Sequence, residues 1–163
     1  MLFDHELGMR YILIDRITLI EPPERACGVK CVSLSEDYFT DHFRNFPVMP
    51  GTLILESLAQ LGGVLVEATA RESGRVDLHA VLCIVERASF RRFVRPGDRL
   101  DLEALRLAGG EDGGRVRVSA RVDGALVTET EMTFALVPVE DRGTLAARAE
   151  LLRVWLADHR AKE

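Results

Sequence analysis

The 163-residue sequence has no long hydrophobic run and few cysteines. The longest unbroken apolar run is Ala80–Val85, far short of the roughly 20 residues that a membrane-spanning helix needs. Residues Met1–Glu6 contain neither a basic nor an apolar segment, so no signal peptide is predicted. Three cysteines are too few, and odd in number, for a disulfide scaffold. We therefore expect a soluble cytoplasmic protein without a membrane partner.

Metal-binding patterns and an excess of positive charge are missing as well. The sequence has no CxxC or HExxH motif and no cluster of His and Cys, so no metal site is predicted. The net charge of −5 argues against nucleic acid as a main partner. Cys27, Val29 and Cys31 alternate along one face of an expected strand, and we interpret the two thiols as core residues.

Five of the 21 Lys and Arg residues fall in one short segment. A local basic patch on an acidic protein fits a specific anionic partner, whereas arginines solvated at strand ends are the alternative. Both interpretations stay open from composition alone. The segment spans residues 87–99 and contains Arg87, Arg91, Arg92, Arg95 and Arg99.

One long helix dominates the first half of the pattern. Apolar residues go almost all the way round residues 52–72, which predicts a buried helix roughly 30 Å long. Two strands are expected before it, over residues 10–20 and 24–34, around the Pro22-Pro23 turn. Because such a helix must be covered, we expect an antiparallel sheet to wrap it, which gives an α+β fold.

The second half is predicted to consist mainly of strands. The continuous apolar run over residues 78–90 is typical of a strand covered on both faces. Asp123-Gly124 is a type I′ turn signal and predicts a hairpin. We divide the chain into a domain over residues 1–140 and a helical extension over residues 141–163. The elements expected after the buried helix are strands 78–90, 99–107 (with a bulge), 115–122 and 126–137, and an amphipathic helix over 141–161.

Residues 41–60 contain the parts of a proton-transfer site. His42 lies in a loop bounded by proline, and a neutral imidazole, with an ordinary pKa of about 6.5, is the natural base at neutral pH. Glu56 lies among apolar residues early in the helix, where burial favours a protonated acid. The N–H of Gly51 at the helix N-terminus favours developing negative charge. Together these groups suit removal of a proton alpha to a carbonyl and loss of a beta-hydroxyl.

Each of these residues also has a simpler interpretation. A loop histidine is often solvated, a glutamate can stabilise the first turn of a helix, and a glycine can serve only a turn. The residues alone leave both interpretations open.

The same stretch resembles the signature of the FabZ-type 3-hydroxyacyl-acyl-carrier-protein dehydratases, His-Phe-Pro-Gly-x-Pro-x-Met-Pro-Gly followed by Glu-Ala-(Leu/Met)-Ala-Gln. Here residues 42–51 read His-Phe-Arg-Asn-Phe-Pro-Val-Met-Pro-Gly, and residues 56–60 read Glu-Ser-Leu-Ala-Gln. The likeness covers roughly residues 9–137. Arg44 and Asn45 replace the family's Pro-Gly, which indicates a specialised substrate preference. Asn tolerates left-handed backbone, so the loop is still expected to close.

The resemblance implies a fold, an assembly and a role for each residue. It implies the hot-dog fold, with the sheets of two subunits running together in a homodimer, three dimers often forming a hexamer, and no cofactor. His42 would be the base and Glu56, from the other subunit, the acid. Gly51 would donate its backbone N–H to the thioester carbonyl. Gln60 would support the catalytic residues without touching the substrate.

The implied reaction is reversible dehydration of a (3R)-3-hydroxyacyl thioester to the trans-2-enoyl thioester, in fatty-acid or polyketide-type synthesis. Its substrate is carried by an acyl carrier protein, which is acidic. Arg91, Arg92, Arg95 and Arg99 are therefore candidate docking residues. Two alternatives remain: a hot-dog acyl-thioesterase that uses the helix carboxylate, and a non-catalytic subunit that binds an acyl carrier or an active homologue.

Overall fold

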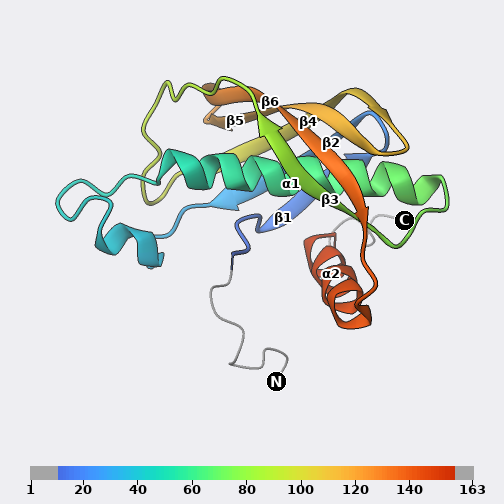
Figure 1. Cartoon of the computed structure of the whole chain (residues 1–163). Helices are drawn as coiled ribbons and strands as arrows, with labels where there is room; N and C mark the ends of the chain where they lie inside the picture. The colour runs from blue at the N-terminus through green and yellow to red at the C-terminus, as the bar shows by residue number, and fades with distance from the viewer. Residues whose placement is uncertain (1–10, 157–163) are drawn as a thin grey trace.

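A six-stranded antiparallel sheet wraps around one long helix in the computed structural model, which describes residues 11–156 (Figure 1). The α+β class and the order of elements agree with the prediction. The elements are β1 (Arg16–Glu21), β2 (Arg25–Cys31), the 3₁₀ helix η1 (Asp37–Thr40), α1 (Gly51–Glu72), β3 (Leu78–Val85), β4 (Arg99–Gly110), β5 (Gly113–Val122), β6 (Ala125–Pro138) and α2 (Arg142–Trp155).

The strands follow the order β1-β2-β4-β5-β6-β3, with β1 and β3 at the two ends. The β5–β6 hairpin turns at Asp123 and Gly124, whose φ angles of 49° and 77° confirm the type I′ turn. The bulge predicted from a shift of the apolar positions between Leu102 and Leu105 is not found there, because the pairing with β5 runs unbroken from Asp101 to Arg106; the register shift in β4 lies between Arg106 and Ala108.

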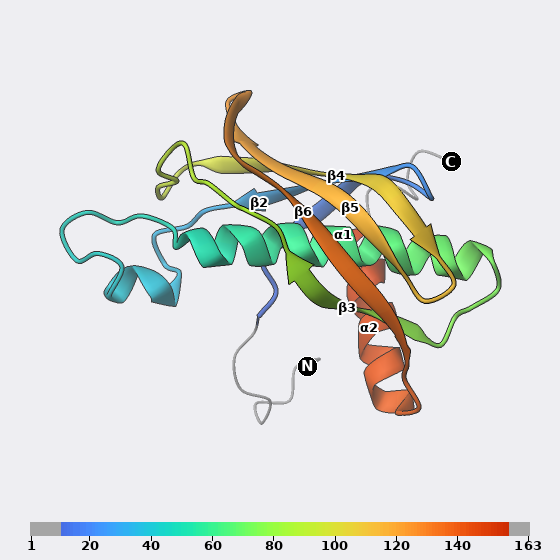
Figure 2. The ribbon, with the colours of Figure 1, turned by 45° about the horizontal axis from the view of Figure 1, so that its top comes forward.

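Helix α1 lies in the concave side of this sheet (Figure 2). Leu58 and Leu61 are fully buried. Gly62 lets the sheet approach closely, since a Cβ there would lie 3.1 Å from Val116 and Phe134 atoms of β5 and β6. By length and composition α1 could also cross a membrane, but 67% of its most apolar 18-residue stretch is buried inside the domain. The covering sheet thus accounts for its apolar surface.

The predicted core position of the thiols in β2 is wrong. Cys31 is exposed and Cys27 is only half-buried, while Ala26 and Gly28 are buried. A Cβ at Gly28 would lie 3.4 Å from Leu61 Cδ1 of α1. Ala26, Gly28 and Lys30 alternate on a buried face out of phase with the two cysteines, and Val29 is buried as well.

Strand β3 is an edge strand, so the prediction that both its faces are covered is wrong for the single chain. It pairs with β6 along one side and ends the strand order. Val81 and Ile84 are 47% and 50% exposed, and Leu82 and Val85 are exposed as well. An exposed apolar edge of this kind can pair with another strand.

Helix α2 begins close to the predicted start and packs against β1. Asp141 caps it by accepting from the hydroxyl and from the N–H of Thr144, and these hydrogen bonds lower the pKa of the Asp141 carboxyl. Trp155 is 2% exposed, and its Nε1 donates to Ile14 O at 2.7 Å. The rest of the predicted helix, over residues 157–161, lies outside the described residues. The division into residues 1–140 and 141–163 stays a prediction.

We predict that Trp155→Ala lowers the free energy of unfolding by about 3 kcal/mol, because it removes a buried ring and leaves Ile14 O without its partner. Urea unfolding of both proteins measures the change. Val154→Ala is the matched control: Val154 is 57% exposed on the same helix, so its loss is expected to cost less than about 0.5 kcal/mol. Equal losses would contradict the anchoring role of Trp155.

Candidate active site

His42 lies in the loop that connects η1 to α1. Its Nδ1 is 2.8 Å from Val48 O. Because a carbonyl oxygen can only accept a hydrogen bond, Nδ1 must carry the proton, and the neutral ring keeps its lone pair on Nε2. The imidazole stacks on Phe43, with ring centroids 4.3 Å apart. The loop thus presents a half-buried histidine in the tautomer that a general base needs.

The loop closes through its own backbone. Phe43 N donates to Phe46 O at 3.2 Å, and Phe46 N donates to Phe43 O at 2.9 Å, with Arg44 and Asn45 between them. The His42-Phe43 peptide bond is cis. Among the described residues other than glycine, only Asp123 has a positive φ. The turn therefore closes without the left-handed Asn45 that we expected to help it.

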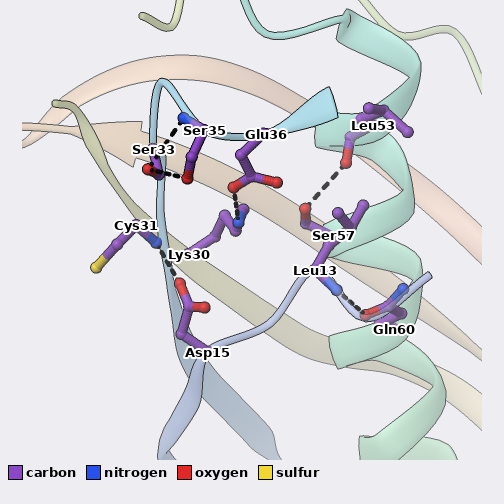
Figure 3. Close-up of polar contacts among 10 residues, drawn as sticks. All are labelled: Leu13, Asp15, Lys30, Cys31, Ser33, Ser35, Glu36, Leu53, Ser57 and Gln60. Atoms are coloured by element: carbon purple, nitrogen blue, oxygen red, sulfur yellow. Dashed lines mark hydrogen bonds and ion pairs between the residues drawn. The ribbon is translucent and has the colours of Figure 1, made fainter. Parts of the chain in front are cut away.

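The segment that leads into η1 is held by one side chain from β2 (Figure 3). Lys30, 4% exposed, forms an ion pair with Glu36. Further along, Tyr38 O accepts from the N–H of His42 at 3.0 Å. Burial, with smaller contributions from Glu36 and Asp15, raises the pKa of Tyr38. These contacts connect the position of His42 to the sheet.

Gly51 begins helix α1, and Pro50 provides no side-chain cap. The first-turn N–H groups of a helix have no partners within the helix, so they point outward as donors. Phe90 explains why this position is glycine, since a Cβ on Gly51 would lie 2.7 Å from the Phe90 ring. Phe90 begins the segment Phe90–Asp98 that resembles the family's Phe-Arg…Pro-Gly-Asp stretch, but no sequence pattern places its ring against Gly51.

Glu56 and Gln60 lie together one turn apart on α1. Gln60 Nε2 donates to Glu56 Oε1 at 3.0 Å and to Tyr11 O at 2.8 Å. Its Oε1 accepts from Leu13 N at 3.0 Å (Figure 3). Glu56 is half-buried and lines a groove of about 290 Å³. Gln60 thus fixes one carboxylate oxygen of Glu56 and ties it to the segment before β1.

His42 and Glu56 are not brought together within one chain. No hydrogen bond joins them in the part of the chain that the structure describes: the His42 side chain contacts Val48 and Phe43, and Glu56 contacts Gln60. A chain on its own therefore carries the two halves of the predicted site separately. Over residues 11–156, no group of three or more His, Cys, Asp and Glu side chains is arranged to hold a metal ion.

The four candidate docking arginines are all exposed, between the end of β3 and the start of β4. Arg95 lies over the Phe46 ring at 4.6 Å, and this ring meets Phe93 edge-on at 5.5 Å. Arg99 forms an ion pair with Asp101 at 2.9 Å. Arg95 is therefore next to the His42 loop, whereas the charge of Arg99 is partly neutralised. Arg91 and Arg92 complete the set.

Solved structures of other proteins share this architecture. The dehydratase heterocomplex ApeI:P from Xenorhabdus doucetiae superposes with a TM-score of 0.65 at 17% identity, over 80% of this chain and 85% of that chain. The smu.793 protein from Streptococcus mutans, bound to acetyl CoA, gives 0.61 at 14% identity, over 85% and 100%. At these identities the likeness establishes the fold, and it confirms the hot-dog class.

Sequence comparison identifies the family within that class. A model of the FabA-like domain matches residues 7–131. The 3-hydroxyacyl-[acyl-carrier-protein] dehydratase FabZ of Bacillus velezensis is 43% identical over 126 residues, 77% of this chain and 87% of the relative. FabZ of Anoxybacillus flavithermus is 43% identical over 128 residues, again 77% and 87%. The chain belongs to the FabA-like family. Both of these relatives are FabZ dehydratases.

We predict that Gln60→Met lowers the free energy of unfolding by about 1–3 kcal/mol, because it leaves Leu13 N and Tyr11 O without their partner. Urea unfolding measures the loss. Thr52→Ala, at an exposed position of the same helix, is the control and is expected to stay within about 0.5 kcal/mol of the parent protein. If Gln60→Met behaves like this control, the hydrogen bonds of Gln60 do not hold the segment before β1.

Proposed function

We propose that this protein catalyses the reversible dehydration of (3R)-3-hydroxyacyl thioesters, carried by an acyl carrier protein, to trans-2-enoyl thioesters in fatty-acid or polyketide-type synthesis. The FabZ relatives, named for this reaction, support it. The observation that carries the proposal is the bond from His42 Nδ1 to Val48 O, which leaves Nε2 as a base.

The reaction assigns one role to each residue. His42 Nε2 takes a proton from C2, and the electron pair of that C–H bond forms the C2=C3 double bond. Negative charge that develops on the thioester oxygen is stabilised by the N–H of Gly51 at the start of α1. The C3–O bond breaks, and Glu56, held by Gln60, gives its proton to the departing hydroxyl, which leaves as water. Hydration is the reverse sequence.

The working unit is a homodimer, and three such dimers would form the hexamer that the family resemblance implies. The apolar edge of β3 supports the dimer, because pairing with the β3 of a second copy would cover Val81, Leu82, Ile84 and Val85 and extend the sheet. In such a dimer His42 of one subunit would work with Glu56 of the other. The separation of the two residues within one chain is consistent with this arrangement.

The carrier would dock on the arginines between β3 and β4. Arg91, Arg92 and Arg95 are exposed, and Arg95 lies beside the His42 loop, so an acidic carrier bound there would deliver its acyl chain next to the base. Arg99 is the weakest member of the set because Asp101 already pairs with it. With an acyl carrier as its substrate partner, the protein would work in the cytoplasm.

We predict that purified protein changes the absorbance of the enoyl-thioester band with 3-hydroxybutyryl and crotonyl thioesters. His42→Ala removes the base and Glu56→Gln removes the acid, so each is expected to lower kcat by about a hundred- to ten-thousand-fold. Thr52→Ala is the control, at an exposed position of the same helix.

Other outcomes would contradict this proposal. Comparable rates for His42→Ala and the parent protein would show that the activity does not use His42. Release of the free acid and thiol in place of the enoyl thioester would indicate a thioesterase. Tight binding of an acyl carrier with no turnover of carrier-bound substrates would indicate a non-catalytic subunit.

We predict that the double variant Arg91→Glu/Arg92→Glu raises KM for a carrier-bound substrate by about ten-fold and leaves KM for a short pantetheine thioester unchanged, because only the carrier reaches the basic patch. Steady-state kinetics with both substrates measure the split. Arg121→Glu/Arg142→Glu is the matched control, because it makes the same change in net charge at two exposed arginines elsewhere. Equal effects on both substrates would contradict docking at Arg91 and Arg92.

A further inference from the structure

A second polar cluster lies deeper along α1, beyond Glu56 and Gln60. Glu67 is 2% exposed, although it carries a carboxylate. It accepts from Arg148 Nε at 3.1 Å and from the backbone N–H of Ala80 at 3.1 Å. His79 Nδ1 lies 3.3 Å from Glu67 Oε1. The cluster thus joins α1, β3 and α2, and the proton-transfer chemistry proposed above uses none of its members.

This cluster and Glu56 line the same groove of about 290 Å³. Glu67 follows Glu56 by three helical turns, so it lies on the same face of α1, about 16 Å further along the axis. The wall between them includes the small residues Ala59, Gly63 and Ala80. A chain attached to a thioester at Glu56 therefore has a path along α1 that ends at charged and polar groups.

One atom at the end of this path has no partner. His79 Nε2 is buried and makes no hydrogen bond within the described residues. Because Nδ1 lies next to the Glu67 carboxylate, which has no hydrogen to donate, that contact favours the neutral ring with its proton on Nδ1, and Nε2 then keeps a lone pair. A buried polar atom without a partner is unfavourable, and a hydrocarbon chain laid against it would prevent water from satisfying it.

We propose that the groove selects acyl chains with a hydroxyl group at the end remote from the thioester, and that His79 Nε2 binds this hydroxyl. The inference rests on the proposed dehydratase function and names its substrate class. A hydroxyl fits both states of the ring, since it donates to a neutral Nε2 and accepts from a protonated one. Glu67 and Arg148 are positioning residues that hold the imidazole at the end of the groove.

Arg148 also has a structural role that is separate from this selection. Its guanidinium lies over the Trp155 ring of the same helix, at 5.5 Å, and forms an ion pair with Glu67 of α1. This ion pair stabilises the packing of α2 against the domain. That role explains why a carboxylate is buried at position 67. It does not supply a partner for His79 Nε2, and it predicts no difference between substrates with polar and apolar chain ends.

The test compares pairs of 3-hydroxyacyl thioesters of equal length, with and without a terminal hydroxyl, over a series of chain lengths. The readout is the ratio of kcat/KM within a pair, which cancels any loss of folded protein. For lengths that reach the cluster we expect the parent protein to prefer the hydroxylated chain by roughly three- to ten-fold, the worth of one hydrogen bond. His79→Leu is expected to abolish or invert this preference, and Arg153→Met, on the exposed side of α2, to keep it.

The outcomes separate this inference from the proposed function. A ratio near one at every length, or a preference that His79→Leu leaves intact, would overturn the inference while the dehydratase stands. If the parent protein turns over neither the 3-hydroxybutyryl thioester nor any longer one, the proposed function fails. Calorimetric binding of the same pairs then tests the groove directly, and equal affinities within each pair overturn the inference.

Discussion

Helix α1 must be kept out of water along almost its whole length, and the rest of the structure follows from this constraint. Its 22 residues are too apolar for a free surface helix, so the sheet curves around it, with Gly62 and Gly28 allowing close approach. The wrapped sheet places Glu56 in a groove that it shares with Gln60 and the cluster around Glu67. It also fixes where α1 begins, and Met49 N, bonded to Val94 O at 2.8 Å, ties the loop before α1 to the segment before β4.

The sheet that covers α1 has an exposed apolar edge at β3. Within one chain, His42 also lies apart from Glu56, the proposed acid. Both features are incomplete in one chain, and the proposed homodimer completes both at once, since pairing of β3 edges would bring a second copy alongside. The groove along α1 then joins the site to the cluster around Glu67. Because α2 supplies Arg148, this tail helix contributes to the groove as well as to the stability of the domain.

Much of this fold could be predicted from the sequence, because its strongest signals are local. The apolar circumference of α1 and the Asp123-Gly124 turn depend on neighbouring residues alone. The errors concern long-range packing. The alternation around Cys27 and Cys31 does not show which residues of β2 are buried, since Ala26, Val29 and Lys30 are buried by packing against distant segments. The run that forms β3 is equally consistent with a covered strand and with an edge. The Phe90 ring over Gly51 and the unpartnered His79 Nε2 depend on residues distant in sequence, so no local pattern reveals them.

The central claim is that one active site takes His42 from one subunit and Glu56 from the other. Co-expression of His42→Ala and Glu56→Gln chains with different tags, followed by purification of the mixed dimer, tests it most directly. One site of that dimer would contain both wild-type residues, so the account predicts about half of the parent protein's rate per dimer. A mixed dimer no more active than either variant alone would contradict the shared site.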